Sequence, residues 1–347
     1  YGAVSIIKVK ANWFHVRERG VFGAIFGTLI SFGVYFAFEW GQAVVDMTKA
    51  KLPAAPGGLT HLLRDVFLPA GATMDATWAV FFIPALILLG WAVLDFWLIK
   101  ETPELAGFPY LDTHDASSGH MHEEYSTLDL LKKVFLSPLM LLLAGVELTA
   151  GVLRNGIMQW YTIFAKQVPQ VGAEFFAHNW GLLLCLFGIV GGFAGGLVSD
   201  KFFQSRRGPP AAIFCAFMLI MASVMAMNIF SFPMLVGISA LLIVAAVTGV
   251  HSLMSGTAAA DFGGRKATAT CSGIVDGCVY LGSTIQSFAV GFLTDPSFKG
   301  HSWQWWPLFL IPFALVGGLI AWKLWHELPA ATRKYIDEHE TKKVAAR

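Results

Sequence analysis

The chain has 347 residues, of which 56% are hydrophobic and only 14% are charged. Soluble globular domains carry about 25% charged residues, so this composition excludes an ordinary soluble domain and indicates a polytopic membrane protein. The formal net charge of +1 gives no reason to expect a nucleic-acid partner, and the partners expected are the lipid bilayer and a small molecule.

A helix that crosses a bilayer needs about 20 mostly apolar residues. Eight runs reach this length, and part of a ninth opens the chain. The expected helices cover residues 1–14 (partial), 20–44, 76–99, 138–165, 179–199, 210–231, 233–256, 268–292 and 303–325. Between the second and third lies a shorter apolar piece, Leu59–Leu68, which predicts an interfacial helix.

The long connection at residues 100–136 is polar and rich in histidine and acidic residues. Its histidines have no fixed geometry, so a solvated linker is expected and no metal site; they are His114, His120 and His122. The four cysteines fall inside apolar spans without metal-ligand spacing and are interpreted as small buried residues. No nucleophile–base pair or phosphate-cradling glycine loop is present, so neither enzyme activity nor a cofactor is expected.

Lysine and arginine gather on alternate connections. One side collects Arg17, Arg19, Lys100, Lys132, Lys133, Lys201, Arg206, Arg207, Arg265, Lys266, Arg333, Lys334, Lys342, Lys343 and Arg347. The other side holds Lys49, Lys51, Arg64, Lys166 and Lys299. The positive-inside rule makes the first side cytoplasmic, which predicts a cytoplasmic C-terminus.

The long linker separates an incomplete group of three spans from a complete group of six. Six plus six spans joined by a cytoplasmic linker is typical of transporters built from repeated halves, so three helices are expected before Tyr1. The expected domains are residues 1–99, the remainder of an N-terminal bundle; 100–137, the linker; 138–326, a six-helix bundle; and 327–347, a cytoplasmic tail.

Arg154 is the most unusual residue of these spans. It lies near the middle of the apolar run from Leu139 to Phe164, where a guanidinium, which cannot lose its proton, costs about 2.5–3.5 kcal/mol on insertion scales. A cation kept at this cost predicts an anionic ligand such as a phosphate group, which guanidinium binds through two parallel hydrogen bonds. The alternative is an ion pair with Glu147, two turns earlier on roughly the same face, and both roles can coexist.

The stretch GGFAGGLVSDKFFQSRRG, from Gly191 to Gly208, resembles the cytoplasmic loop signature of the major facilitator superfamily. In that signature glycines allow close helix packing, an Asp meets the end of a neighbouring helix and basic residues hold the loop inside. The matching residues are Gly192, Gly195, Gly196, Asp200, Lys201, Arg206 and Arg207. Gly188, Gly273 and Gly277 are likewise interpreted as helix-contact glycines.

Four more stretches are similar to the organophosphate:phosphate antiporters, the family of glycerol-phosphate and hexose-phosphate transporters. They are NWFHVRERG (Asn12–Gly20), KETPELAGFP (Lys100–Pro109), VLRNGIMQW (Val152–Trp160) and RKATATCSGIVDGCVYLGS (Arg265–Ser283). The resemblance implies an all-α membrane bundle with the major facilitator fold, two pseudo-symmetric six-helix halves of which the first is incomplete here. It also implies a monomer in the bacterial inner membrane.

The resemblance further implies a carrier that works by alternating access and exchanges a phosphate ester for inorganic phosphate. Two arginines clamp the phosphate in this family; Arg154 corresponds to the second, and the first is expected upstream of Tyr1. An ungapped alignment from RERG puts Ile30 where glycerol-phosphate transporters carry a histidine, which counts against glycerol 3-phosphate itself. A sugar-phosphate receptor and a proton-coupled organic-anion symporter stay open as alternatives.

Two further candidates for substrate binding lie on the same predicted helix as Arg154. Tyr161 and Gln159 are expected to offer hydrogen bonds to substrate oxygens. For Tyr161 the alternative is an aromatic residue at the membrane interface. Lys8 matches a basic position of the family and adds positive potential for an anion; its alternative is to reach the cytoplasmic interface with its long side chain.

Asp276 and His251 are the remaining intramembrane candidates. Asp276 lies in the middle of span 268–292, where a carboxylate must be paired, protonated or hydrated. It is expected to contact substrate hydroxyls, to carry a coupling proton or to form a salt bridge with another helix. His251 titrates in the range of a proton relay, and a hydrogen-bonded packing histidine is the alternative.

Overall fold

The protein is described from a computed structural model, which covers residues 2–15, 19–49, 58–68, 74–111, 132, 135–168, 173–204, 206–255 and 259–327. The linker histidines and the tail after residue 327 lie outside these ranges. The elements are α1 (Gly2–Trp13), α2 (Arg19–Tyr35), the π-helix η1 (Phe36–Trp40), α3 (Gly41–Met47), α4 (Gly58–Phe67), α5 (Ala76–Leu98), η2 (Glu104–Ala106), α7 (Pro138–Met158), α8 (Trp160–Gln167), α9 (Ala173–His178), α10 (Trp180–Leu197), the π-helix η3 (Val198–Phe202), α11 (Gly208–Asn228), α12 (Pro233–Leu253), α13 (Ala259–Thr294) and α14 (Trp305–Lys323).

The all-α prediction is confirmed, because every element of the described chain is helical. Span 20–44 forms one continuous helical run through α2, η1 and α3, and the Leu59–Leu68 piece forms α4. Six of the described helices are long and apolar enough to cross a membrane. The other two predicted spans are the run that contains the π-helical turn η1 and the less apolar α13.

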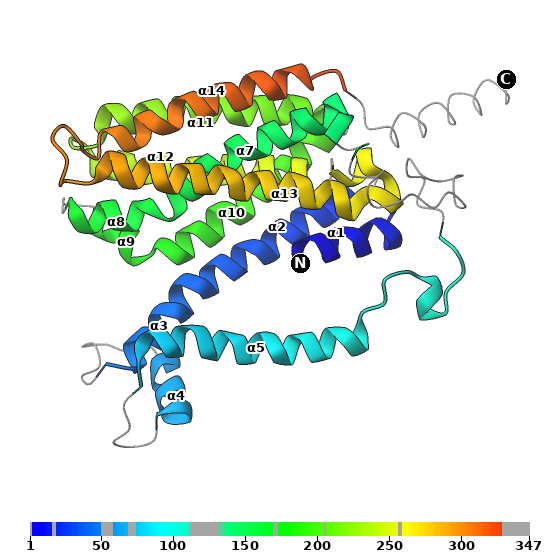
Figure 1. Ribbon diagram of the computed structural model, residues 1–347, viewed down its shortest axis with the longest axis horizontal. Coiled ribbons are helices and arrows are strands. Elements are labelled where there is room, and N and C mark those ends of the chain that lie inside the picture. The colour runs from blue at the N-terminus through cyan, green and yellow to red at the C-terminus, as the bar shows by residue number, and fades with distance from the viewer. Residues whose placement is uncertain are drawn as a thin grey trace.

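Six helices, α7 and α10–α14, form one bundle (Figure 1). In it α7 packs against α13 and α14, α11 against α12 and α14, and α10 against α12, and a single buried apolar cluster runs through it. From the N-terminal part of the chain, α2 packs on α10 and α1 on α13. Helix α2 also contacts α12, so it lies against the face of the bundle that carries α10 and α12.

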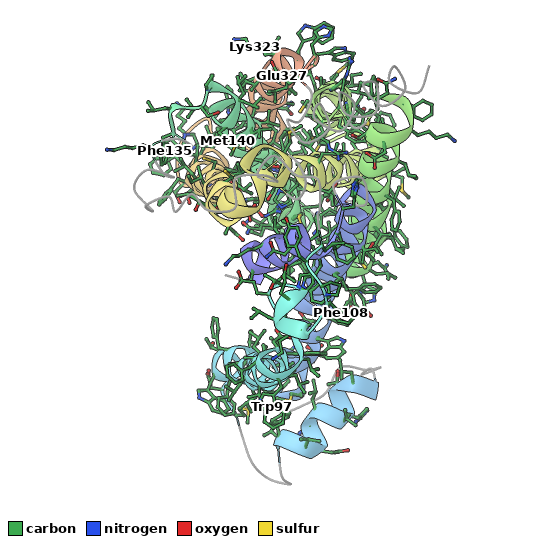
Figure 2. All side chains as sticks on the ribbon, turned by 90° about the vertical axis from the view of Figure 1, so that its right-hand side faces the viewer. Trp97, Phe108, Phe135, Met140, Lys323 and Glu327 are labelled. Carbon is green, nitrogen blue, oxygen red and sulfur yellow. The ribbon has the colours of Figure 1, made fainter. Side chains whose placement is uncertain are left out.

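Helix α5 lies apart from this bundle and packs on α3. Figure 2 shows Trp97 of α5 in a separate lower layer, far from Met140 and Lys323 of the bundle. Its side chains Phe96 and Trp97 are 82% and 75% exposed. Outward-facing apolar side chains on a long helix suit a hydrocarbon environment, so α5 supports the interpretation of the chain as a membrane protein.

Glycines set the closest helix crossings. A Cβ at Gly151 would meet the backbone of Val279, and one at Gly282 would meet the carbonyl of Leu148, so α7 and α13 touch backbone to backbone. The same contact joins Gly191 of α10 to α12. Such close approach is what small residues allow in membrane bundles.

The other glycines expected at helix contacts differ in how closely a neighbouring helix approaches them. Gly192 of α10 faces Gly27 of α2, and Gly188 faces the Ser31 side chain, as expected for a close crossing of α2 and α10. The expectation was wrong for Gly273 and Gly277, because no described atom lies within 4 Å of a Cβ built at either residue.

The loop between α10 and α11 is held by its own polar side chains. Asp200 accepts a hydrogen bond from Nη1 of the buried Arg207 at 2.8 Å, and Arg207 also donates to the Ser199 hydroxyl at 2.9 Å. Ser199 in turn donates to the carbonyl of Arg206. Lys201 is exposed and Gly196 half-buried. Asp200 thus lies at the start of α11, since Arg207 is the residue that precedes this helix.

Asp200→Asn is expected to lower the free energy of unfolding by about 1 kcal/mol. The substitution removes the charge that pairs with Arg207, and the estimate is kept low because Asp200 is 33% exposed. The measurement is thermal unfolding of the purified full-length protein in detergent. Lys201→Gln, which removes an exposed charge next to it, is the control, and equal melting temperatures for the two variants would contradict the role of the pair.

The start of the linker is bound to the end of α1. Trp13 Nε1 donates to the carbonyl of Lys100 at 3.0 Å, and Asn12 Nδ2 donates to the carbonyl of Glu101 at 3.2 Å. The Glu101 carboxylate lies 2.6 Å from Lys8 Nζ. Two stretches that are far apart in sequence, NWFHVRERG and KETPELAGFP, therefore begin in contact.

Candidate functional site

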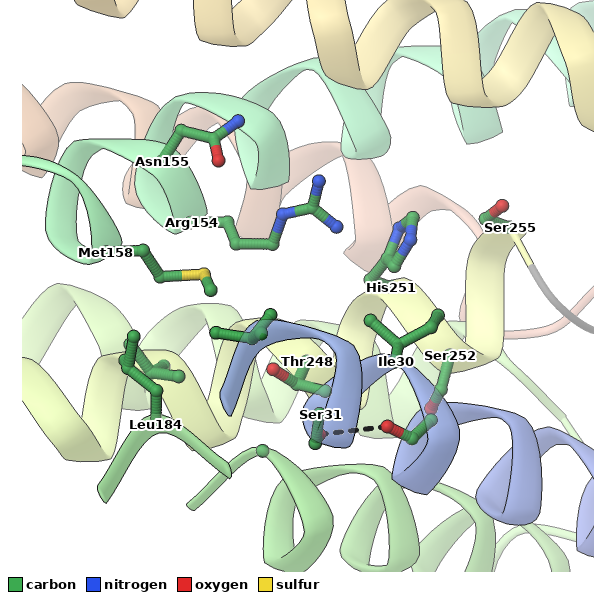
Figure 3. Close-up of a pocket in the computed structure, with 14 residues that line it drawn as sticks. Ile30, Ser31, Arg154, Asn155, Met158, Leu184, Thr248, His251, Ser252 and Ser255 are labelled. Atoms are coloured by element: carbon green, nitrogen blue, oxygen red, sulfur yellow. Dashed lines mark hydrogen bonds between the residues drawn. The ribbon is translucent and has the colours of Figure 1, made fainter. Parts of the chain in front are cut away.

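A cavity of about 200 Å³ lies where α2 crosses α7, α10 and α12 (Figure 3). Apolar side chains and glycines make up much of its wall, with a few polar groups between them. The lining residues are Gly27, Ile30, Ser31, Val34, Arg154, Asn155, Met158, Leu184, Gly188, Val244, Thr248, His251, Ser252 and Ser255. An apolar cavity with a few converging polar groups is the usual form of a small-molecule site.

Arg154 enters this cavity from α7 as a half-buried side chain. In Figure 3 its guanidinium extends toward His251 of α12. Within the described part of the chain no carboxylate forms an ion pair with Arg154. The guanidinium therefore brings a positive charge into an enclosed space, which favours an anionic ligand because the low local dielectric strengthens the attraction.

Glu147 pairs with His251 in the structure, and not with Arg154, the partner considered from the sequence. Its side chain has no exposed surface, and its Oε2 lies 2.9 Å from Nδ1 of His251. The alternative in which Glu147 pairs with Arg154 is therefore replaced by a Glu147–His251 pair between α7 and α12. This pair gives the sequence-predicted His251 a hydrogen bond and leaves Arg154 available to a ligand.

Asp276 lies beside the cavity rather than in its wall. The carboxylate, on α13, accepts a hydrogen bond from the Ser255 hydroxyl, and Ser255 itself lines the cavity. Asn155, the residue after Arg154, donates to the Ser283 hydroxyl on the same helix α13. Both contacts tie α13 to the wall of the cavity, so Asp276 is placed to act through Ser255.

Three predicted residues are not brought into the cavity. Tyr161 is fully buried, with its ring stacked on Trp180 at a centroid distance of 4.3 Å. Gln159 is exposed at the junction of α7 and α8. Lys8 is 44% exposed and pairs with Glu101 at the end of a separate cavity beside α1. Any role of these residues in binding needs a change from this arrangement.

The sequence reasoning overlooked a row of hydroxyl groups on α12 and just after its end, where Ser255 follows Leu253. Thr248, Ser252 and Ser255 line the cavity together with His251. These positions follow the spacing of one helical face, so the pattern was present in the sequence. Ser31 of α2 lies opposite them, with its hydroxyl bonded to the carbonyl of Gly27 at 2.9 Å (Figure 3).

A scan against protein-family models finds no match. Among curated proteins, the glycerol-3-phosphate transporter of Bacillus subtilis is 25% identical over 297 residues, which is 83% of this chain and 60% of the relative. The membrane sensor protein UhpC of Salmonella typhimurium is 23% identical over 92% of this chain and 66% of the relative. The chain thus spans about 60% to 66% of the length of these two relatives.

A probable hexose phosphate transport protein of Chlamydia pneumoniae is 23% identical over 94% of this chain and 68% of the relative. Among solved structures, the fucose:proton symporter FucP of E. coli has a TM-score of 0.55 at 18% identity, covering 87% of this chain and 67% of FucP. A second FucP structure, in the outward conformation, has a TM-score of 0.60 at 15% identity, covering 90% and 69%.

The structural neighbours confirm the major facilitator fold. The relatives are named as transporters and sensors rather than enzymes, which confirms the expectation that the chain is not an enzyme. The apolar helices make it a multi-pass membrane protein. The chain therefore has the major facilitator fold, and its sequence is similar at 23–25% identity to a glycerol-3-phosphate transporter, a membrane sensor protein and a probable hexose phosphate transport protein.

Proposed function

We propose that the protein carries a phosphorylated organic anion, such as a sugar phosphate, across the membrane in exchange for inorganic phosphate. The observation that supports this most is Arg154, a cation in the central cavity without a carboxylate partner among the described residues. The guanidinium binds a phosphate group through two parallel charge-assisted hydrogen bonds. Lining residues such as Met158 and Leu184 exclude water and so strengthen this attraction.

The positive charge of Arg154 is also the reason to propose exchange rather than transport in one direction. Alternating access requires the cavity to face each side of the membrane in turn, while the protein shifts between two conformational states. An empty cavity carries its positive charge through this change at an electrostatic cost. A bound anion offsets the charge, so the loaded protein reorients more readily and each outward movement of phosphate is matched by an inward movement of the ester.

The same proposal includes the organisation expected from the sequence. Residues 1–99 and 138–326 belong to two bundles that move relative to each other, and residues 100–137 join them. We place the protein in the bacterial inner membrane as a monomer, with residues 327–347 in the cytoplasm. The contacts of α2 with α10 and of α1 with α13 are then the surfaces that change during the movement.

Two other functions have specific support. The similarity to UhpC, named a membrane sensor protein, favours a receptor that binds sugar phosphate without transporting it. The pair of Glu147 and His251, together with Asp276, favours proton-coupled symport, since these groups can hold a proton next to the cavity.

Uptake of radiolabelled inorganic phosphate by proteoliposomes that contain the full-length protein separates the three functions. Antiport requires phosphate or a phosphate ester inside the vesicles. Symport proceeds into vesicles without internal anion when a pH gradient is imposed. A receptor shows saturable phosphate binding but no uptake under either condition. We expect uptake only with internal phosphate, and uptake into empty vesicles driven by the pH gradient would contradict antiport.

Ile30→His is expected to shift the substrate preference toward glycerol 3-phosphate. Ile30 lines the cavity opposite α12, and one hydrogen bond to a charged phosphate contributes about 1.5–3 kcal/mol, so the ratio of inhibition constants for glycerol 3-phosphate and glucose 6-phosphate should change by on the order of tenfold. Inhibition of phosphate exchange gives both constants. Leu29→His, on the neighbouring residue outside this cavity, is the control, and an unchanged ratio in Ile30→His would exclude residue 30 from substrate selection.

A further inference from the structure

The Glu147–His251 pair is the polar feature of the cavity that phosphate binding by Arg154 leaves unused. Glu147 Oε2 lies 2.9 Å from His251 Nδ1, while Glu147 itself has no exposed surface. A carboxylate inside a membrane bundle has to be paired, protonated or hydrated, and here the imidazole provides the pairing. The contact joins α7 to α12, the two helices that supply Arg154 and the row of hydroxyl groups.

The pair also fixes which nitrogen of His251 is available. Because Nδ1 faces Glu147, the remaining ring nitrogen is Nε2, and it has no hydrogen-bond partner among the described residues. His251 lines the same cavity as Arg154, and the guanidinium extends toward its ring (Figure 3). A second ligand-binding nitrogen is thereby placed close to the first cation.

We propose that His251 is a second phosphate-binding residue of this cavity, with Glu147 as its positioning residue. The proposal rests on the proposed function, because it names a partner for Arg154 in binding the same phosphate group. The Glu147 carboxylate accepts the hydrogen bond from Nδ1, holds the ring in place and supplies a counter-charge. The imidazolium then donates from Nε2 to a phosphate oxygen that Arg154 binds from the other side.

The proton balance allows both ionisation forms of the substrate to bind. A phosphate monoanion transfers its proton to Nε2 and becomes the dianion without net proton uptake, whereas a dianion binds together with one proton that the buffer acid releases. Both routes end with a dianion between guanidinium and imidazolium.

The other titratable groups around His251 are few in the part of the chain described. From α7 come Glu147 and Arg154, and from α13 comes Asp276 through Ser255. Two thiols lie near Glu147, Cys215 on α11 and Cys278 on α13. The described lining residues of α2 and α10 are uncharged, and α9 meets α12 near its other end, where Phe176 lies against Gly237. His251 is therefore the group expected to take up the proton.

Calorimetric titration of the full-length protein in detergent with inorganic phosphate tests the proposal. Repeating the titration in buffers with different ionisation enthalpies gives the number of protons taken up as well as the affinity. For the wild type, at a pH where phosphate is mostly the dianion, we expect net proton uptake, and an affinity that falls as the pH rises. His251→Asn should weaken binding by on the order of tenfold and remove the uptake, and Glu147→Gln should reduce both.

His178→Asn, which removes an exposed histidine at the end of α9, is the matched control and should leave both quantities unchanged. His251→Gln replaces His251→Asn where the latter does not give monodisperse protein. Wild-type affinity and proton uptake in the His251 variants would overturn the proposal. If those variants bind normally while Arg154→Lys does not, only this inference fails; if the wild type binds no phosphate, the proposed function fails as well.

Discussion

Replacing Arg154 by lysine is expected to slow phosphate exchange by on the order of 10- to 100-fold. Lysine keeps the positive charge but loses the planar fork that binds two phosphate oxygens at once. A hydrogen bond to a charged group contributes about 1.5–3 kcal/mol, and the loss of one such bond corresponds to this range of rates or affinities. The measurement is the initial rate of radiolabelled phosphate exchange in proteoliposomes.

The matched control is Lys166→Gln. Lys166 is exposed near the end of α8, which continues the direction of α7 beyond Gln159, and it does not line the cavity. Loss of this positive charge should leave the exchange rate unchanged. If Arg154→Lys exchanges phosphate as fast as the Lys166 variant, a guanidinium at residue 154 is not needed and the role assigned to Arg154 is wrong.

Gly282→Val is expected to destabilise the bundle more than any surface substitution. A Cβ at this position would meet the carbonyl of Leu148 and the nitrogen of Val152 on α7, and backbone atoms cannot turn aside as a side chain does. Overpacking of a filled interior costs about 1–3 kcal/mol or more. Since α7 carries Arg154, we expect a lower melting temperature together with weaker phosphate binding.

Gly277→Val provides the comparison on the same helix. No described atom lies within 4 Å of a Cβ at Gly277, and valine has no lower helix propensity than glycine, so the same valine there should cost little stability. Melting temperatures of the two purified variants, followed by size-exclusion chromatography after heating, measure the difference. Equal melting temperatures would show that α7 and α13 do not touch at Gly282.

The helices and the placement of Arg154 could be predicted because both depend on local composition. Apolar runs of sufficient length predicted the helices, and a lone arginine in the run Leu139–Phe164 predicted a polar cavity. The partner of Glu147 could not be found in this way. His251 lies 104 residues away, and the crossing of α7 and α12 that brings the two together is a property of the folded bundle.

Tyr161 shows a second limit of helical periodicity. Seven residues after Arg154, it should lie on nearly the same face of one continuous helix. Instead α7 ends at Met158, where the indole of Trp180 donates to the Met158 carbonyl at 2.9 Å. Helix α8 begins at Trp160, beyond the cavity, and Tyr161 stacks on Trp180 there. No local signal such as proline marks this break in the sequence.

The most direct test of the central claim asks whether phosphate occupies the cavity beside Arg154. Thr248→Cys introduces a thiol into the cavity wall, whereas Lys166→Cys introduces one on an exposed surface of α8. The rate of alkylation of each thiol in the full-length protein is measured with inorganic phosphate and with chloride at equal ionic strength. We expect phosphate to protect Cys at position 248 only, and to lose this effect when Arg154→Lys is added. Equal alkylation rates in phosphate and chloride would contradict a phosphate site in this cavity.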